Sequence, residues 1–159
     1  MAVSVICVGR LREKYFADAA EEYMKRLKRI MPVSVIELPD EPEPAQPSDK
    51  LNEAVMKREG EKILQKIGQY DHVIAMCIEG KLLSSEDLSK KLEQLAVSGK
   101  TQLTFLIGGS FGLHQSIKDM ADLKLSMSPM TFPHHMARVM LLEQIYRAYQ
   151  ISDGTRYHK

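Results

Sequence analysis

The chain has 159 residues, 44% of them hydrophobic, and its 22 Lys and Arg nearly balance its 21 Asp and Glu, which gives a formal net charge of +1. A chain of this length builds one ordinary hydrophobic core, so we expect a single domain over residues 1–159. The near-neutral charge excludes a large positive field for binding free nucleic acid, so any RNA contact must come from local arginines and lysines.

The cysteines and the hydropathy pattern indicate the compartment. Cys7 and Cys77 each lie inside an apolar run and not in a metal-ligand spacing. We therefore expect buried thiols of a reducing compartment and no metal site. No apolar run is as long as the roughly 18 residues of a membrane span. The apolar stretch at residues 3–8 is too short for a signal peptide, so we expect a cytoplasmic protein without a membrane partner.

The first half of the chain alternates between apolar runs and helical spacing. An apolar run covers residues 2–8, and apolar residues at helical spacing then continue until Pro32. The prolines of residues 39–47 predict a stiff surface loop, and Ser48 or Asp49 can cap the helix that follows. The predicted elements are strand 2–8, helix 13–30, strand 33–38 and helix 49–67.

The second half continues this alternation. Residues 72–78 form an apolar run typical of a strand buried on both faces, and we expect residues 79–81 to turn the chain out of it. Ser84 and Asp87 resemble a capping box at the start of the next helix, which Gly99 ends. The remaining predicted elements are strand 103–107, helix 115–121, strand 123–126 and helix 135–149. This order predicts an α/β fold with a mostly parallel sheet and helices on both faces.

Two loops of the predicted sheet form the candidate site. Gly108 and Gly109 end the strand 103–107, and glycines there can adopt positive φ and let a ligand approach the backbone closely. The second loop, residues 127–133, contains two prolines, and Met76 lies near the carboxyl end of another strand. Loops at neighbouring strand ends make a crevice, the usual ligand position in such sheets. The sequence matches neither G-x-G-x-x-G nor a P-loop.

The last predicted helix has one strongly apolar face. Apolar residues recur along it at Met136, Val139, Met140, Tyr146 and Tyr149. Left bare on a monomer, this face would be an unusually large apolar patch. We therefore expect a homodimer.

Several motifs taken together carry a resemblance to one family. They are residues 105–109 (FLIGG), 130–134 (MTFPH), 143–148 (EQIYRA), 157–159 (YHK) and the early stretch 9–15 (GRLREKY). Over essentially its whole length, the chain resembles the ribosomal RNA large subunit methyltransferase H family of SPOUT-class enzymes. Arg156 departs from the pattern, since the family usually has proline there.

The resemblance implies a fold and a reaction. The fold would be a SPOUT domain with a C-terminal trefoil knot, which nothing in the periodicity predicts because knots are nearly absent from folds in general. A homodimer would transfer a methyl group from S-adenosylmethionine to N3 of a pseudouridine in 23S rRNA. The low charge favours the assembled ribosome as the target over free RNA. The implied cofactor contacts fall on Met76, Gly108, Met127, Ser128, Pro129, Met130, Thr131 and Phe132.

The implied chemistry depends mainly on geometry, because a methyl group on a sulfonium is already activated. The proton on N3 must leave, so a base, or a cation that favours the anion, would help. His158 is the candidate base, Arg138 is the candidate electrostatic helper, and Tyr157 is the third candidate catalytic residue. We expect Tyr157 and His158 of one protomer to complete the crevice of the other. For His134 and His135 we expect an N-cap or surface role.

Two alternatives stay open on the sequence. One is a different nucleotide-binding α/β protein that uses phosphate chemistry at Gly108 and Gly109. It would need a lysine or a metal-binding acid at the loop, and the sequence places none there. The other is a non-enzymatic dimeric ribosome-binding module whose interaction face is the last helix.

Overall fold

Five strands and five helices alternate in the computed structural model, which describes residues 1–69, 71–155 and 157. Along the chain they are β1 (Ala2–Val8), α1 (Lys14–Lys28), β2 (Val33–Leu38), α2 (Asp49–Leu64), β3 (His72–Leu82), α3 (Ser85–Val97), β4 (Gln102–Ile107), α4 (Gln115–Met120), β5 (Leu123–Ser126) and α5 (His134–Ser152). Every predicted strand and helix is therefore present, with ends shifted by a few residues. The predicted caps also form, because Ser48 Oγ accepts from the Leu51 N–H at 3.2 Å and Ser84 Oγ from the Asp87 N–H at 3.0 Å.

The five strands form one sheet in the order β2-β1-β4-β3-β5, and each pairing between them is parallel. The central strands β1 and β4 have side chains buried on both faces, as their continuous apolar runs predict. Val5 and Ile6 of β1 are fully buried on opposite faces, and so are Phe105 and Leu106 of β4. The sheet is all parallel, where the sequence predicted a mostly parallel one.

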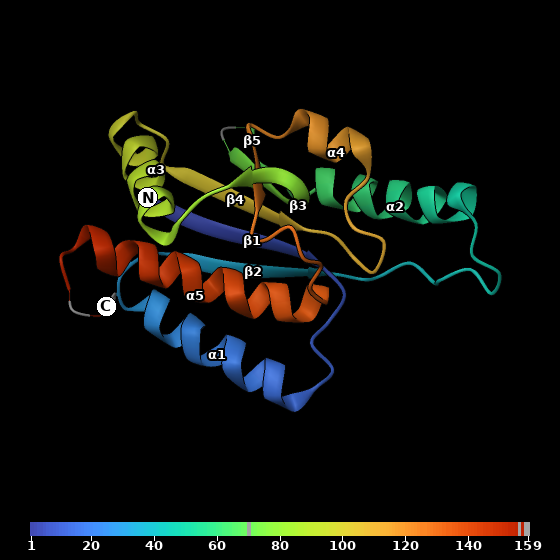
Figure 1. The fold of residues 1–159 in the computed structure, drawn as a ribbon, viewed down its shortest axis with the longest axis horizontal. Coiled ribbons are helices and arrows are strands. Elements are labelled where there is room, and N and C mark those ends of the chain that lie inside the picture. Colours follow the sequence, from blue (N-terminus) through green and yellow to red (C-terminus); the bar gives the residue numbers. More distant parts are fainter. Residues whose placement is uncertain (70, 156, 158–159) are drawn as a thin grey trace.

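Helices cover both faces of this sheet (Figure 1). On one face, α1, α3 and α5 pack through leucines such as Leu27, Leu92 and Leu142. On the other face, α2 and α4 pack through Ile63 and Ile117. This confirms the predicted α/β architecture, in which the carboxyl ends of all five strands point the same way.

Strand β3 is longer than the sequence predicted. Residues 79–81 were expected to form a turn, but β3 runs to Leu82, and both Met76 and Lys81 lie opposite Leu125 of β5. The residues between them bulge out and cross β5 closely, since a Cβ on Gly80 would lie 2.6 Å from the backbone carbon of Leu125. Glycine is required here by this close approach and not by a turn. The crossing is consistent with a trefoil knot, and the knot itself stays a prediction.

Among the helices of the described residues, none is long and apolar enough to cross a membrane. Across residues 1–69, 71–155 and 157, no group of three or more His, Cys, Asp or Glu side chains is arranged to hold a metal ion.

Candidate functional site

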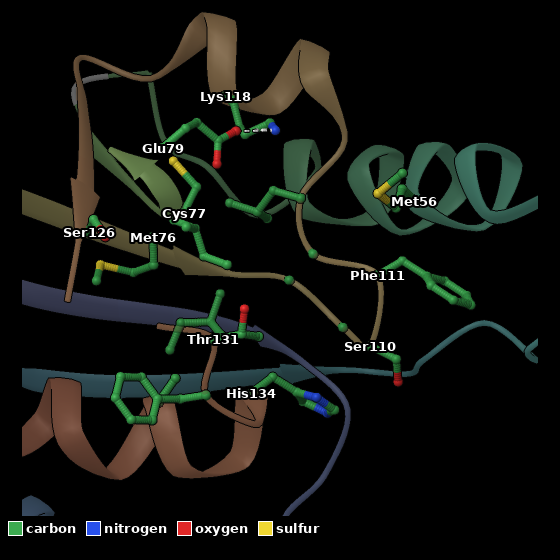
Figure 2. Close-up of a pocket in the computed structure, with 18 of the residues that line it drawn as sticks. Met56, Met76, Cys77, Glu79, Ser110, Phe111, Lys118, Ser126, Thr131 and His134 are labelled. Atoms are coloured by element: carbon green, nitrogen blue, oxygen red, sulfur yellow. Dashed lines mark hydrogen bonds and ion pairs between the residues drawn. The ribbon is translucent and has the colours of Figure 1, made fainter. Parts of the chain in front are cut away.

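A cleft of about 1120 Å³ lies over the carboxyl ends of β3, β4 and β5. Its walls are the loop after β4, the loop after β5, the bulge of β3 and one side of α2 (Figure 2). Most of the predicted cofactor residues line it: Met76, Gly108, Met127, Ser128, Met130, Thr131 and Phe132. Pro129 is the exception and is not part of the wall. The structure therefore brings together residues between positions 76 and 132. From the sequence, we expected them to be close only because they follow neighbouring strands.

The loop after β4 is shaped by close packing around Gly108. A Cβ at this position would lie 2.3 Å from the backbone carbon of Gly112 and 2.7 Å from the nitrogen of Leu113. The loop folds back on itself, with the Gly112 N–H donating to the Gly109 carbonyl at 3.0 Å. Positive φ, which the sequence suggested for Gly108 and Gly109, occurs instead at Gly112, where φ is +85°. No side chain fits at Gly108, because the backbone of Gly112 and Leu113 occupies that space.

The loop after β5 is held by its own serines. Ser126 Oγ donates to the Ser128 carbonyl at 3.0 Å, and Ser128 Oγ accepts from the Met130 N–H at 3.0 Å. Met130 remains 71% exposed at the rim of the cleft. These bonds fix a compact turn that presents backbone groups and apolar side chains to the cleft, next to the start of α5.

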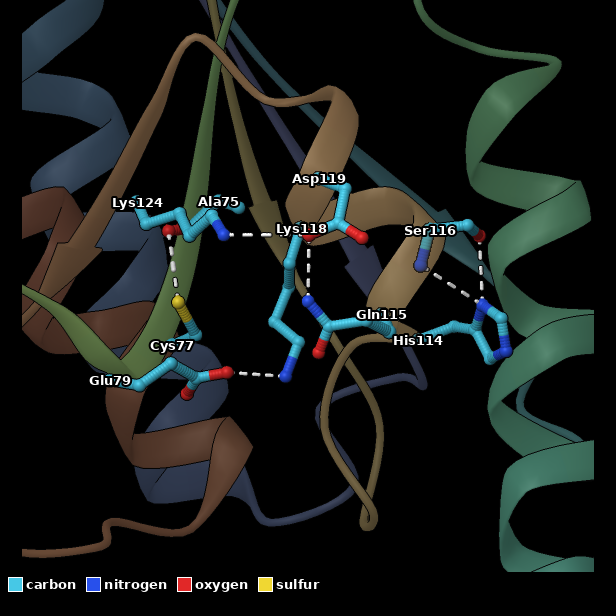
Figure 3. Close-up of polar contacts among 9 residues, drawn as sticks. All are labelled: Ala75, Cys77, Glu79, His114, Gln115, Ser116, Lys118, Asp119 and Lys124. Carbon is cyan, nitrogen blue, oxygen red and sulfur yellow. Dashed lines mark hydrogen bonds and ion pairs between the residues drawn. The ribbon is translucent and has the colours of Figure 1, made fainter.

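A charged pair in the cleft wall was not anticipated from the sequence. Lys118 of α4 donates to the Glu79 carboxylate on the bulge of β3 (Figure 3). This hydrogen bond lowers the pKa of Glu79 below its ordinary value. The two residues are 39 positions apart, and the sequence placed Glu79 in a turn, so no local pattern could pair them. Together they give the wall a donor and an acceptor beside its apolar part.

The cysteines differ in their surroundings. Cys7 is fully buried, as expected, and burial raises its pKa to about 12. Cys77 is only partly buried, which corrects the expectation of a buried thiol, because it lies on the β3 bulge in the cleft wall. Burial and the nearby Glu79 carboxylate raise the pKa of Cys77, so it is a weak nucleophile.

Arg138, the candidate electrostatic helper, is 1% exposed and does not line the cleft. One guanidinium nitrogen lies 2.5 Å from Glu37 Oε1, and another donates to the Gly9 carbonyl at 2.8 Å. These contacts join α5 to the carboxyl ends of β1 and β2. Within one chain they favour a structural role, and the catalytic role stays a prediction.

Tyr157 packs against α5 between Glu143 and Arg147 and does not line the cleft. The Tyr157 hydroxyl lies 3.3 Å from Glu143 Oε1, its ring contacts Tyr146, and the Arg147 guanidinium lies 4.9 Å from the ring centre. Burial and a hydrogen bond with Tyr23 raise the pKa of Tyr157 to about 12. His158 lies outside the described residues. Glu143, which Tyr157 contacts, is nine residues from His134, roughly 14 Å along the helix axis.

His134 and His135 begin α5, but the N-cap is Pro133, so the N-cap expectation for them is wrong. Their rings lie 4.1 Å apart, and His135 Nδ1 lies 3.4 Å from Glu13. His134 is half-buried and lines the cleft (Figure 2). Burial, and then the neighbouring His135, lowers the pKa of His134, which keeps its imidazole neutral at physiological pH.

A parallel α/β sheet with a cleft over the carboxyl ends of its strands defines a protein that binds a small ligand at that edge. The cleft is suited to a ligand with both apolar and polar parts, because it combines the Gly108 backbone, methionine side chains and the pair of Glu79 and Lys118. The geometry by itself leaves the kind of ligand and reaction open.

Comparison with known proteins supplies the family. A family model described as "Predicted SPOUT methyltransferase" matches residues 1–158, and the chain belongs to this family of methyltransferases. Proteins named "Ribosomal RNA large subunit methyltransferase H" are similar along their whole length. One from Leuconostoc mesenteroides subsp. mesenteroides is 49% identical and one from Streptococcus uberis 45%, each with all of both chains covered.

A solved structure gives the same fold. It is described as "a probable methylase family protein from Haemophilus influenzae Rd KW20" and superimposes with a TM-score of 0.54 at 13% identity. The match covers 99% of this chain and 70% of that one. At this level of identity the likeness shows the fold alone, and it agrees with the family assignment.

Proposed function

We propose that this protein transfers the methyl group of S-adenosylmethionine to N3 of a pseudouridine in 23S rRNA, acting as a homodimer on the assembled ribosome. The names of the full-length relatives support ribosomal RNA of the large subunit as the substrate. The observation that carries the proposal is that the residues with which the family is expected to hold its cofactor converge on one cleft, around Gly108 and the loop after β5. Such a function implies a cytoplasmic location.

The cleft fits this cofactor in size and chemistry. Ligand sites usually have volumes of about 300–1,000 Å³, and the cleft, at about 1120 Å³, is slightly larger than that range. Met76, Leu125 and Phe132 offer an apolar wall for an adenine ring, and the Gly108 backbone offers polar groups at a place where a Cβ would not fit. When bound, S-adenosylmethionine supplies a methyl group that is already activated by a positively charged sulfur.

The protein then has to orient the base and accept its proton. His158 is the proposed base for the N3 proton, with Tyr157 beside it in the tail and Arg138 as an electrostatic helper. Arg138 could act only at a distance within one chain, because it is buried and paired with Glu37. Its contact with the Gly9 carbonyl instead holds the segment after β1 against α5.

In the proposed homodimer, the tail of one protomer acts in the cleft of the other. The buried face of α5 consists of residues such as Leu141, Leu142 and Ile145, whereas Met136 and Tyr149 of the predicted apolar face stay 38% and 36% exposed. A second protomer on this exposed face would bury it. The tail leaves α5 at the end of that face, which supports its action in the partner's cleft.

Phosphate chemistry is the weaker alternative for this cleft. The structure does bring a lysine into the wall, Lys118, but this side chain is paired with Glu79. A paired ammonium has little charge left for a triphosphate. Nothing on the cleft surface favours this alternative over a methyl donor.

Calorimetry tests the proposal. Titration of the purified protein with S-adenosylmethionine, NAD and ATP in separate experiments should show saturable binding of the first only. Binding of S-adenosylmethionine without methyl transfer to ribosomal particles would favour the non-enzymatic module. Binding of ATP or NAD instead would overturn the assignment of the cleft.

A further inference from the structure

Glu59 of α2 is a buried acid that the proposed reaction does not use. It is 3% exposed, and its Oε1 accepts from the Glu41 backbone N–H at 3.1 Å. Its Oε2 is buried and has no hydrogen-bond partner within residues 1–69, 71–155 and 157. A buried carboxyl with an unpartnered oxygen is costly, and its presence asks for an explanation in function or strain.

The nearby cation does not compensate this oxygen. Lys62, one turn along α2, lies 2.6 Å from Glu41 Oε1 and also donates to the Pro39 carbonyl at 2.9 Å. Burial accordingly raises the pKa of Glu59, while the Glu41 N–H and Lys62 act in the opposite direction. The pKa of Glu59 is thus higher than that of an exposed glutamate.

The free oxygen lies directly against the loop after β4. A Cβ on Gly109 would lie 2.9 Å from Glu59 Oε2 and 3.1 Å from Oε1, so the loop rests on the carboxyl. The φ of Gly109 is not positive, so contact with its neighbours, and not backbone conformation, excludes a side chain there. The Glu59 carboxyl and the loop at Gly109 therefore pack directly against each other.

This loop is a shared wall between two cavities. Residues 109–111 and His134 line both the large cleft and a second cavity of about 250 Å³, which Glu59 also lines (Figure 2 shows Ser110, Phe111 and His134). The loop therefore separates the cleft, where a ligand would bind, from the Glu59 carboxyl.

We propose that Glu59 is a positioning residue for the methyl donor, whose free oxygen accepts a hydrogen bond from the loop 109–111 when the donor is bound. The inference rests on the proposed function of the cleft. Bond formation with the loop stabilises the carboxylate, so binding lowers the pKa of Glu59 from its raised value in the free protein. The affinity for the methyl donor therefore increases as the pH rises through the raised pKa of Glu59 in the free protein. Over the same pH range, binding of the methyl donor releases a fraction of a proton.

Other titratable groups surround Glu59 and set the design of the test. On the loop after β2 they are Asp40, Glu41 and Glu43, and on the segment after β1 they are Arg10, Arg12 and Glu13. His134 and His135 of α5 complete the cavity. Since any of these could exchange protons on binding, the contribution of Glu59 must be isolated by substitution.

The experiment is calorimetric titration with S-adenosylmethionine, from pH 5 to 8, in two buffers with different ionisation enthalpies. It compares the wild-type protein with Glu59→Gln, which keeps the shape and an oxygen for the Glu41 N–H. Glu61→Gln is the matched control, because Glu61 is exposed on the same helix. Wild type and Glu61→Gln should release a fraction of a proton per site. Glu59→Gln should lose this release and about tenfold in affinity, as for one hydrogen bond to a charged group.

The outcomes are separable. Equal affinity and equal proton release in Glu59→Gln and wild type would overturn the role of Glu59 while leaving the cofactor assignment intact. Loss of affinity with unchanged proton release would reduce Glu59 to a packing residue and also overturn the proposal. If even wild type fails to bind S-adenosylmethionine, the proposed function fails and this inference with it. If Glu59→Gln does not fold, the wild-type protein still tests the proposal. Binding of S-adenosylmethionine to wild type without any proton release would contradict it.

Discussion

At the scale of single residues, the site depends on positions where the backbone has no room for a side chain. Gly108 packs against Gly112 and Leu113, and Gly109 packs against Glu59. The sequence predicted the importance of these glycines from their place at a strand end. It could not identify Glu59, or the Glu79 and Lys118 pair, because the partners are distant along the chain and share no local spacing.

A bulky side chain at Gly108 should abolish binding of the methyl donor. In Gly108→Arg the new Cβ would lie within 2.5 Å of Gly112, so the loop must open and lose the shape of the cleft wall. We expect an increase of the dissociation constant for S-adenosylmethionine by at least about a hundredfold, the effect of losing roughly two good hydrogen bonds. Gly99→Asn is the control, since a Cβ there meets no atom within 4 Å and asparagine tolerates the φ of +82° better than most residues. Undiminished binding by a folded Gly108→Arg protein would contradict the loop assignment.

Stability should depend on His72 at mildly acidic pH. Burial lowers the pKa of His72 below its ordinary value near 6.5, although Asp122 acts in the opposite direction. The neutral ring is therefore favoured by folding, and the stability is fully present above pH 6.5. It falls as the pH decreases below 6.5, because the unfolded chain takes up the proton more readily.

Urea unfolding of wild type and His72→Val between pH 5 and 7.5 measures this effect. The free energy of unfolding of wild type should decrease below pH 6.5, and that of His72→Val should decrease less. His134, whose pKa is also lowered, accounts for a remaining slope in the variant. Parallel curves for the two proteins would show that His72 is not responsible.

At the scale of elements, the apolar patterns predicted strands and helices well because burial decides them. The apolar runs of β1 and β4 predicted two strands, and both strands are buried on both faces. The bulge of β3 was missed, since Glu79 and Gly80 resemble a turn in sequence and only the approach of β5 shows their role. For α5, the predicted apolar face is divided, because Val139 and Tyr146 pack against the core whereas Met136 and Tyr149 stay exposed.

The ion pair between Arg138 and Glu37 should hold α5 on the sheet. Arg138 is buried, whereas the Glu37 side chain is 37% exposed, so the two partners are not equivalent. Glu37→Ala leaves an uncompensated buried guanidinium and should lose about 3 kcal/mol of unfolding free energy. Arg138→Met leaves a carboxylate that water can reach and should lose clearly less. Denaturant unfolding measures both, and the reverse order would refute this account of the pair.

At the scale of the whole molecule, the cleft lies at the N-terminal end of α5, whereas Tyr157 packs against the middle of this helix, outside the cleft. In the proposed homodimer, the tail of one protomer would complete the cleft of the other. The near-zero net charge gives the molecule little general affinity for RNA, so the proposed function requires recognition of its target by shape.

A complementation experiment tests the shared site. Gly108→Arg has a broken cleft and an intact tail, and His158→Ala has the reverse, so each homodimer should be inactive. If the tail acts across the interface, the co-expressed heterodimer has one complete site and recovers up to about half of the wild-type activity per dimer, because one of two sites is intact. Heterodimers verified by native mass spectrometry that remain inactive would show that the tail acts within its own chain.

The most direct measurement of the proposed function is methyl transfer to ribosomal particles that lack the modification, with the product nucleoside identified by mass spectrometry. With S-adenosylmethionine as donor, we expect one 3-methylpseudouridine in 23S rRNA, formed much faster on assembled particles than on naked rRNA. A methyl group on another nucleoside, or no transfer to particles by a protein that binds S-adenosylmethionine, would contradict the account.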